Sequence, residues 1–390
     1  MPLHPELGYF DEGLNLTDPS LYATALDVGE HSSILPPVAY RSRIFAELED
    51  EKLWTRMWCC IGSTQQISMV GDLLPYTLGN HGIHVQRDKN GFSGRFNFAQ
   101  HGGCRFVPAQ CQTGKKTKCS YTSCGYSRDR DVLKTSDVDV DTPILRHFIG
   151  DIPERMLPVQ VETWGGCIFV NVDQNSHTIN HQLTSIAPEI GKSLDKTIDK
   201  HGFWTPLEGN WKVSLGCIFD EICRFGDLTL DNTFQTSESQ VMHRRETHHV
   251  IGKGNTNSYE NYILWIFPNL LITKLGPFIT RIIVQPTGLD EGMARVRFSV
   301  IDKTICFGDD EIKEHENIWK KIISTASNGS KSKHQIYQKW GTPSSPETTN
   351  ENLPKGPEGA GYYFQQYLVD RLLKEYTYVW NAPLYTDARR

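Results

Sequence analysis

The sequence has no long hydrophobic run and no excess of charge of one sign. Its 390 residues carry 40 Lys and Arg against 46 Asp and Glu, a net charge of −6. We therefore expect no broad basic surface for nucleic acid or anionic lipid. The longest apolar stretch, residues 262–284, is interrupted by Pro268, Lys274, Pro277 and Arg281, so it predicts strands and no membrane span.

The N-terminus also lacks a basic region followed by an apolar core, so no secretory signal is expected. Ten cysteines in a chain without that signal predict reduced thiols and a cytoplasmic location. Aromatic residues are plentiful, with 17 Phe, 15 Tyr and 9 Trp, enough to build a sizeable core. At roughly 100–200 residues per domain, the length suggests two domains or one large one.

The first half of the chain changes from a helical to a strand pattern. Residues 42–58 place large apolar side chains at helical spacing and predict an amphipathic helix. From 71 to about 172, short alternating segments separated by turn signals predict a small all-β domain. Within it, Asn90-Gly91 predicts a tight hairpin turn, and Gly165-Gly166 predicts another strand pair.

The second half, from about residue 200, is mixed. A helix is predicted over 210–225 and another over 311–324, and a last helix carries Phe364, Leu368 and Leu372 on one face. A polar, Pro/Gly-rich stretch at 341–361 is a candidate lid, since loops of this length are commonly lids or disordered. Strands are predicted near 241–251, 258–267, 270–275, 279–287 and 292–302.

Several separated blocks agree in order and spacing with one known family. These are GDLLPYTLGNHGIHVQRD (71–88), CSYTSCGYSRDRDVLKTSD (119–137), WGGCIFVNVD (164–173), GNWKV (209–213) and FPNLLI (267–272). In this order the chain resembles the catalytic alpha subunit of Rieske non-haem iron oxygenases, in the choline- and carnitine-monooxygenase-like branch. The resemblance runs from about residue 42 to 378.

The resemblance implies an α+β fold in three parts. An N-terminal arm over 1–41 precedes a Rieske-like all-β domain with its flanking helix over 42–180. A helix-grip catalytic-like domain over 181–390 follows, in which an antiparallel sheet surrounds a long helix and leaves a substrate cavity. Family members commonly form head-to-tail trimers, so a homo-oligomer is a further expectation from the resemblance.

The family's 2Fe–2S cluster is held by Cys-x-His and, further along, Cys-x-x-His, with thiolates on one iron and imidazoles on the other. The corresponding positions here are Ala99, His101, Cys119 and Thr122. One ligand of each iron is missing, and neither Ala nor Thr replaces it. We therefore expect no Rieske cluster.

The family's mononuclear iron site is also incomplete. Asn210-Trp211-Lys212 is present, and Asp220 matches the acidic residue that links the two metal centres in the family. The two His positions are Cys223 and Leu228, and the carboxylate position falls near Trp319. Leu and Trp have no donor atom for ferrous iron, which family members bind with two His and one carboxylate. The sequence therefore predicts that the redox chemistry has been lost and that no cofactor is needed.

A structural zinc ion is an alternative use of the cysteine-rich region, because four sulfur or nitrogen ligands suit zinc. The spacing is irregular, unlike paired Cys-x-x-Cys knuckles, and buried free thiols are the simpler interpretation. The candidate zinc ligands are His101, Cys104, Cys111, Cys119 and Cys124.

Loss of the iron ligands predicts a drier cavity suited to an apolar small molecule. If Asp220 is buried, its carboxyl group is biased toward the neutral form and becomes a candidate hydrogen-bond donor to the substrate. The alternative is that Asp220 pairs with a nearby group such as Arg224. The predicted substrate-contacting residues are Cys223, Phe225, Leu228 and Trp319.

A cavity without redox centres can still accelerate a reaction whose bond changes are internal to the substrate. The first hypothesis is therefore a cofactor-independent cyclase or pericyclase acting on an apolar terpenoid biosynthetic intermediate. Such an enzyme is similar to fungal norbornene-forming Diels–Alderases. The alternatives are a non-catalytic pseudo-oxygenase subunit that binds or stabilises an active oxygenase, and an iron-dependent monooxygenase with unusual ligands.

Overall fold

The structure is a computed structural model. It describes residues 8–27, 31–96, 158–183, 186, 188–230, 249–256, 259–301, 308–342 and 353–375. These residues form two compact units, which are described separately. Unit 1 takes its residues from Leu3–Leu53 and Asn180–Glu375, and unit 2 from Trp54–Ile179. In the described part of the chain, no helix is long and apolar enough to cross a membrane.

Unit 2 contains a six-stranded antiparallel sheet in the order β3-β8-β7-β6-β5-β4. The two outer strands, β3 and β4, contact each other, so the sheet is nearly closed. A buried ion pair joins Arg56 Nη1 to Asp173 Oδ2 at 3.2 Å. The all-β domain predicted from the alternating pattern is therefore present. Its strands are β3 (Cys59–Ser63), β4 (Leu73–Leu78), β5 (His81–Asp88), β6 (Gly91–Phe96), β7 (Pro158–Trp164) and β8 (Cys167–Asn171).

Both predicted strand pairs of unit 2 exist, but one turn differs from the prediction. Strands β7 and β8 are joined by Gly165 and Gly166, which both have positive φ angles, of 58° and 73°. In the other hairpin, Asp88 pairs with Gly91, so the loop consists of Lys89 and Asn90. Gly91 is thus the first strand residue, with a φ of 149°. The prediction that Asn90-Gly91 forms the centre of the turn is wrong by one residue, because strand pairing includes the glycine.

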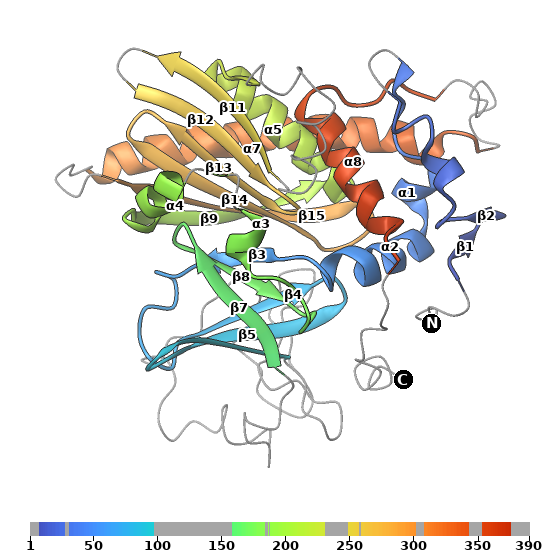
Figure 1. The fold of residues 1–390 in the computed structure, drawn as a ribbon. Helices are drawn as coiled ribbons and strands as arrows, with labels where there is room; N and C mark the ends of the chain where they lie inside the picture. The colour runs from blue at the N-terminus through green and yellow to red at the C-terminus, as the bar shows by residue number, and fades with distance from the viewer. Residues whose placement is uncertain are drawn as a thin grey trace, which may run out of the picture. The chain divides into compact units, whose positions relative to one another are not determined.

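Unit 1 is built on a seven-stranded antiparallel sheet in the order β10-β11-β12-β13-β14-β15-β9 (Figure 1). Strand β14, in the interior of the sheet, is buried along most of its length, as its β-branched residues favour. The first and last strands in the sequence, β9 and β15, pair with a bulge between Phe298 and Ser299. The strands are β9 (Ile198–Glu208), β10 (Thr229–Leu230), β11 (His249–Thr256), β12 (Tyr259–Ile266), β13 (Leu270–Leu275), β14 (Phe278–Pro286) and β15 (Glu291–Val300).

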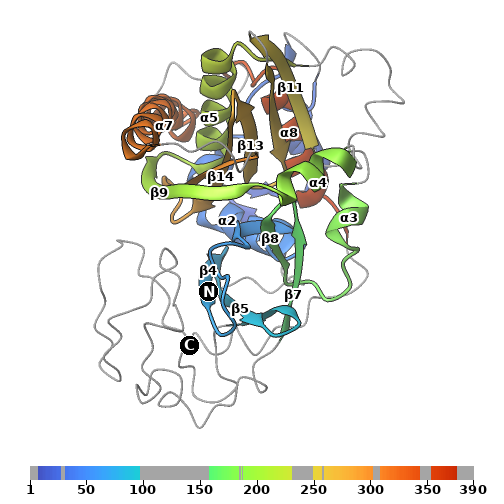
Figure 2. The same cartoon turned by 90° about the vertical axis from the view of Figure 1, so that its left-hand side faces the viewer.

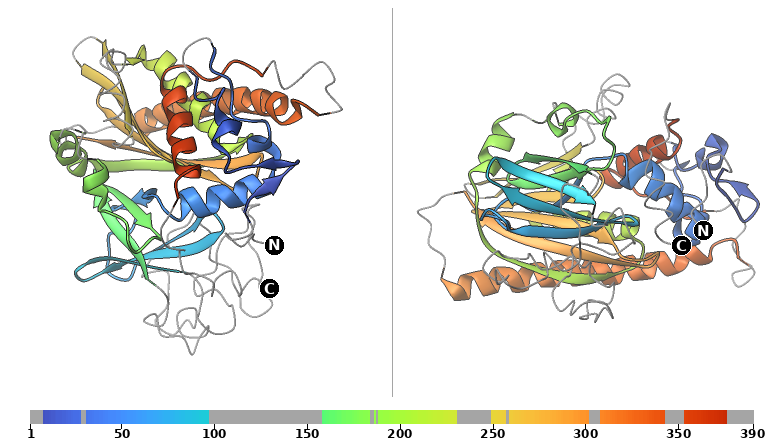
Figure 3. Two further views of the ribbon diagram at one scale, coloured as in Figure 1. Left: turned by 45° about the vertical axis from the view of Figure 1, so that its right-hand side comes forward. Right: turned by 90° about the horizontal axis from the view of Figure 1, so that it is seen from below.

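Two helices, α5 (Trp211–Gly226) and α7 (Asp309–Lys339), cover this sheet. Helix α5 contacts α7 as well as strands β9, β12, β14 and β15. Figure 2 shows α5 and α7 on the same side of the sheet, and the right-hand panel of Figure 3 shows α7 running along it. The predicted α+β class and helix-grip arrangement are confirmed.

Shorter elements, which lie in unit 1 apart from Trp54 and Ile179, complete the described fold. They are β1 (Phe10–Asp11), β2 (Leu14–Asn15), a 3-10 turn at Pro19–Tyr22, α1 (Val38–Arg41), α2 (Arg43–Glu49), α3 (Ile179–Gln182), α4 (Pro188–Asp195) and α8 (Ala360–Leu372). A π-helical turn at Asp50–Trp54 continues α2. The helix predicted over 42–58 is therefore shorter as an α-helix and ends in this turn.

Local sequence explains both ends of α5. The side chain of Asn210 accepts a hydrogen bond from the backbone N–H of Lys212, a standard N-cap interaction. At the other end, Asp227 adopts the left-handed conformation with a φ of 49°, which Asp tolerates better than most residues. The next backbone N–H, of Leu228, donates to the carbonyl oxygen of Cys223 at 2.9 Å. The helix therefore ends between Cys223 and Leu228, the two positions that the resemblance matches to iron-binding His residues.

Helix α7 is much longer than the predicted range of 311–324. Its buried residues beyond that range are small or polar, including Ser327, Ser330 and His334. Ser330 Oγ lies 2.8 Å from Ser214 Oγ of α5, and both side chains are fully buried. Because close packing against α5 selects small polar residues here, the apolar periodicity ends before the helix does.

An ion pair inside unit 1 anchors the start of α5. Lys212 Nζ lies 2.8 Å from Glu49 Oε1 of α2, and both side chains are about 5% exposed or less. Trp211 Nε1 donates to the other carboxylate oxygen at 3.2 Å. Burial lowers the pKa of Lys212, and the Glu49 charge opposes this change. Each charge is therefore tolerated in the interior because the other is present.

We expect Glu49→Gln to lower the free energy of unfolding by about 3–5 kcal/mol, because it leaves the ammonium of Lys212 buried without a counter-charge. The matched control is Lys331→Gln, which breaks the ion pair with Glu208 between side chains that are 52% and 58% exposed. This control should cost about 1 kcal/mol or less. Urea unfolding of the three proteins measures both effects, and equal losses would contradict the assignment.

Candidate functional site

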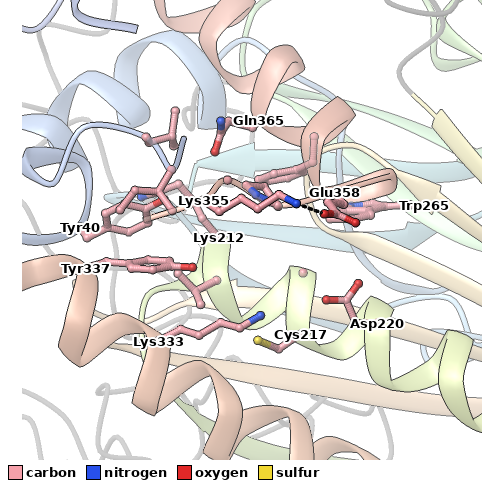
Figure 4. Close-up of a pocket in the computed structure, with 18 residues that line it drawn as sticks. Tyr40, Lys212, Cys217, Asp220, Trp265, Lys333, Tyr337, Lys355, Glu358 and Gln365 are labelled. Atoms are coloured by element: carbon pink, nitrogen blue, oxygen red, sulfur yellow. Dashed lines mark ion pairs between the residues drawn. The ribbon is translucent and has the colours of Figure 1, made fainter. Parts of the chain in front are cut away.

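A cavity of about 480 Å³ opens in unit 1 between α5, α7, α8 and two loop segments. This volume is within the range of about 300–1,000 Å³ that is usual for small-molecule sites. Helix α5 contributes residues along one of its faces, from Lys212 to Asp220, and α7 contributes Lys333 and Tyr337. Figure 4 shows these side chains converging from α5 and α7.

The floor of the cavity is aromatic. Trp265 of β12 and Phe364 of α8 both line it, and their rings stack with centroids 4.8 Å apart. Trp211 meets the edge of Phe364 at 5.7 Å, and Phe219 lies 5.1 Å from Trp265. All four side chains are buried. This packed cluster offers an apolar surface that a hydrocarbon skeleton would contact.

The mouth of the cavity is polar. Asp220 is exposed and lies near Lys333, whose charge affects it (Figure 4). The surrounding protein removes enough water to raise the pKa of Asp220, and the Lys333 charge opposes this shift. Arg224 donates to Glu221 at 2.5 and 3.1 Å. The alternative partner that the sequence offered for Asp220 is therefore engaged elsewhere.

One wall of the cavity consists of residues 355–358, held by the N-terminal segment. The backbone N–H of Gly356 donates to Ser32 O at 2.8 Å, and Ile34 N–H donates to Pro354 O at 3.1 Å. A Cβ atom on Gly356 would lie only 2.4 Å from Ser33 O, so glycine is required for this approach. Lys355 and Glu358 form an ion pair of 2.5 Å. This described end of the predicted lid is fixed by backbone pairing.

Of the predicted site residues, Asp220 is the one that lines this cavity. Cys223 is half-buried one helical turn further along α5, where burial and the charge of Asp220 raise its pKa to about 12. Leu228 is buried after the helix end, whereas Phe225 is 55% exposed. A thiol with so high a pKa is protonated near neutral pH, which argues against a nucleophilic Cys223.

Trp319 is fully buried on α7, and its contacts run to the sheet. Its Nε1–H donates to His315 Nε2 at 2.9 Å. The His315 ring stacks on Phe278 of β14 at 3.9 Å and meets the edge of Phe298 of β15 at 4.9 Å. Burial lowers the pKa of His315 to about 4. Trp319 therefore has a clear packing role, and its predicted contact with a substrate stays a prediction because it does not line this cavity.

Comparison with curated proteins finds Rieske oxygenase subunits. The chain is 29% identical over 173 residues to the alpha subunit of biphenyl 2,3-dioxygenase from Rhodococcus jostii, covering 44% of this chain and 36% of that protein. It is 23% identical over 283 residues to the choline monooxygenase of Atriplex hortensis, covering 67% and 62%. The matches thus span about a third to somewhat under two thirds of these relatives. No family model matches the chain.

Solved structures match over nearly the whole chain. A quaternary ammonium Rieske monooxygenase in complex with gamma-butyrobetaine superposes with a TM-score of 0.63 at 16% identity, covering 92% of this chain and 99% of that one. Naphthalene 1,2-dioxygenase from a Rhodococcus species, bound to indole, gives 0.55 at 14% identity, covering 87% and 94%. The chain has the fold of a Rieske oxygenase alpha subunit. The predicted resemblance is confirmed at this level.

The Rieske oxygenase fold implies a mononuclear iron, and the residues at the matched positions do not fit it. Leu228 has a hydrocarbon side chain, Trp319 uses its only polar group as a donor to His315, and Cys223 holds its proton. Among the described residues, no group of three or more His, Cys, Asp or Glu is arranged to hold a metal ion. The donor set at these positions therefore offers no two-His-one-carboxylate site.

The iron–sulfur cluster and zinc predictions fall outside the described residues. This applies to Ala99, His101, Cys119 and Thr122, and to the additional zinc candidates Cys104, Cys111 and Cys124. The absence of a cluster and the alternative zinc site both stay predictions, as does the homo-oligomer.

Sequence reasoning missed most of the cavity residues, among them Lys333, Tyr337 and Gln365. Lys333 and Tyr337 are four residues apart, so they share a helix face. Extending the predicted helix past 324 would have revealed this pair. Gln365 lies beside Phe364 in the predicted last helix, but nothing in the sequence indicates which cavity its side chain meets.

We expect acid to destabilise the protein through His315. Its pKa is about 4 in the folded chain and 6.5 ordinarily, so the unfolded chain binds more protons between these pH values. The contribution of neutral His315 to the free energy of unfolding is then fully present above pH 6.5 and is lost as the pH falls toward 4. The loss is about 1–3 kcal/mol after allowance for partial exposure. His315→Gln, which keeps an acceptor for Trp319, should reduce this loss.

Urea unfolding near pH 6.5 and near pH 4 measures the difference in the free energy of unfolding between the two pH values. The control is His31→Gln, which changes an exposed imidazole and should leave the acid loss unaltered. An identical acid loss in wild type and His315→Gln would refute the assignment.

Proposed function

We propose that the chain is a metal-independent enzyme that cyclises an apolar, terpenoid-like biosynthetic intermediate by an intramolecular cycloaddition of the Diels–Alder type. The observation that carries this proposal is the replacement of iron donors by Cys223, Leu228 and Trp319 in a fold that still holds a ligand-sized cavity. The reaction takes place in that cavity, against the aromatic floor formed by Trp265 and Phe364.

An intramolecular cycloaddition needs neither electrons nor a co-reactant, because the diene and the dienophile belong to one substrate. Folding the flexible substrate into its reactive conformation removes most of the entropic barrier, which is worth up to about 7–11 kcal/mol in well-oriented systems. An apolar floor holds the substrate in this conformation by contact and by excluding water. The stacked rings of Trp265 and Phe364 are buried and mutually supported, so the surface is rigid enough to impose a shape.

The polar mouth then supplies electrostatic assistance. A raised pKa favours the neutral form of Asp220, which is able to donate a hydrogen bond to a carbonyl group conjugated with the dienophile. Withdrawal of electron density by that bond activates the dienophile. In its neutral form Asp220 acts as a hydrogen-bond donor and transfers no proton to the substrate, and Lys333 is a second donor at the same edge.

The relatives favour a competing function, because those described above are dioxygenases and monooxygenases. Oxygenation by this chain would require a ferrous site made from residues other than those matched here. The two functions differ in their products, since a cycloaddition yields an isomer of the substrate and an oxygenation adds oxygen.

We expect the purified full chain to be colourless and iron-free, and to convert a polyene aldehyde with a tethered diene and dienophile into a product of unchanged mass. Conversion should proceed without oxygen or reductant and in the presence of a metal chelator. Metal analysis, an absorption spectrum and mass spectrometry of the product measure these outcomes. Stoichiometric iron together with a product heavier by oxygen would establish the competing function.

We expect Asp220→Ala to lower kcat/KM about tenfold to a hundredfold, the loss of one hydrogen bond of about 1–3 kcal/mol. Asp220→Asn should fall between Ala and wild type, because an amide N–H still donates. In wild type the rate should decrease as the pH rises through the raised pKa of Asp220, since the donor loses its proton, and Asp220→Asn should lack this decrease. The control is Glu221→Gln on the same helix, because Glu221 pairs with Arg224. This variant should leave kcat/KM unchanged.

A further inference from the structure

Gln365 of α8 is a buried amide with a fixed orientation. It is 3% exposed and lines the cavity. Its Nε2 donates to two backbone carbonyl oxygens of the N-terminal segment, Ala25 O at 2.7 Å and Ser33 O at 2.9 Å. Both amide protons are therefore used, and exchanging the amide N and O would place an oxygen against two carbonyl oxygens. The assignment of the two amide atoms follows from these contacts.

The oxygen of this amide is consequently an acceptor directed toward the cavity. Figure 4 shows Gln365 with its oxygen on the cavity side and its nitrogen away from it. Within the described ranges, no residue donates a hydrogen bond to Oε1. Because Gln365 lines the cavity, a molecule bound there can reach this oxygen and donate a hydrogen bond to it.

The charges around the cavity restrict what this donor is. The ammonium group of Lys212 also lines the cavity and would repel a cationic donor such as an alkylammonium. Lys212 is compensated by Glu49 from outside the cavity, so no negative charge remains for a second cation at this end. A neutral hydroxyl group donates to Oε1 without that repulsion. Leu35 and Phe364, which line the same cavity, have apolar side chains that favour contact with a hydrocarbon group.

We propose that the cavity binds an apolar molecule carrying a free hydroxyl group, which donates to Gln365 Oε1 while its hydrocarbon skeleton lies on Trp265 and Phe364. The inference rests on the proposed use of this cavity as the substrate site and names the substrate class, a hydroxylated hydrocarbon. The hydroxyl lies at the floor, and the opposite end of the molecule reaches Asp220 and Lys333 at the mouth.

A matched set of probes tests this with the full chain. Farnesol, farnesyl methyl ether and farnesylamine share one skeleton and differ in the donor: a neutral hydroxyl, no donor, and a cation. Titration followed by tryptophan fluorescence and calorimetry should show farnesol binding about tenfold tighter than the ether, the effect of leaving the acceptor unpaired. Farnesylamine should bind no better than the ether.

The variant Gln365→Met has a side chain of similar length without an acceptor, and it should bind farnesol and the ether within about twofold of each other. The ratio is measured within one protein, so a general loss of stability from the missing contacts to Ala25 and Ser33 does not affect it. Gln366→Met is the matched control, because Gln366 is equally buried but does not line the cavity, and it should keep the wild-type ratio.

Equal affinities of farnesol and the ether for wild type, or no saturable binding of either, would overturn the inference, as would a Gln365→Met variant that keeps the tenfold preference. If Gln365→Met does not fold, the wild-type preference together with the amine result decides. The experiment measures binding alone, so its outcome can be distinguished from that of the proposed function. A preference for the alcohol without formation of an isomerised product would support the binding site and contradict the cycloaddition.

Discussion

Helix α5 can lie between the sheet and α7 only because its polar groups find partners in the interior. The ammonium of Lys212 meets Glu49, Ser214 meets Ser330, and Asn210 caps the first turn while donating to Leu289 O. Gly209 just before the helix has a φ of 105°, and a Cβ there would lie 2.6 Å from Ser330 Oγ. The start of α5 is thus fixed by several independent contacts, and the position of every cavity residue on this helix follows from it.

This constraint distinguishes the middle of α5 from its C-terminal end. Residues Val213, Gly216, Cys217 and Asp220 follow helical spacing and face the cavity, whereas Cys223 and Leu228 belong to the helix end, where the backbone reverses through Asp227. In the related oxygenases, according to the resemblance, iron ligands occupy that end. Chemical change at the end of the helix leaves its start and middle unaltered, because the contacts that fix the helix are elsewhere. The cavity beside this end is therefore positioned by contacts that do not involve Cys223 or Leu228.

The sequence was informative where local patterns decide the structure. Alternating β-branched residues indicated the sheet of unit 1, Gly165-Gly166 indicated a turn, and the apolar stripe of 210–225 indicated α5 within one residue at each end. It was uninformative where packing decides. The buried residues in the second half of α7 include Ser327, Ser330 and His334, of which Ser330 contacts Ser214 of α5, and small polar residues give no apolar period. The cavity itself joins segments as distant as Leu35, Trp265 and Gln365, whose proximity depends on tertiary structure alone.

A conserved architecture does not fix a reaction, because function resides in the side chains that a fold presents. Here the low identity to solved oxygenases, 14–16% over most of the chain, is compatible with retained layers and replaced chemistry. The residue at one of the matched positions makes specific contacts. Trp319 is tied by a hydrogen bond to His315, which in turn stacks on Phe278, so an aromatic and imidazole cluster packs on the sheet at the position matched to a carboxylate ligand. Restoring a metal ligand there would require dismantling that packing. Trp319 is therefore part of the packing between α7 and the sheet, and the cavity beside α5 is lined by other residues.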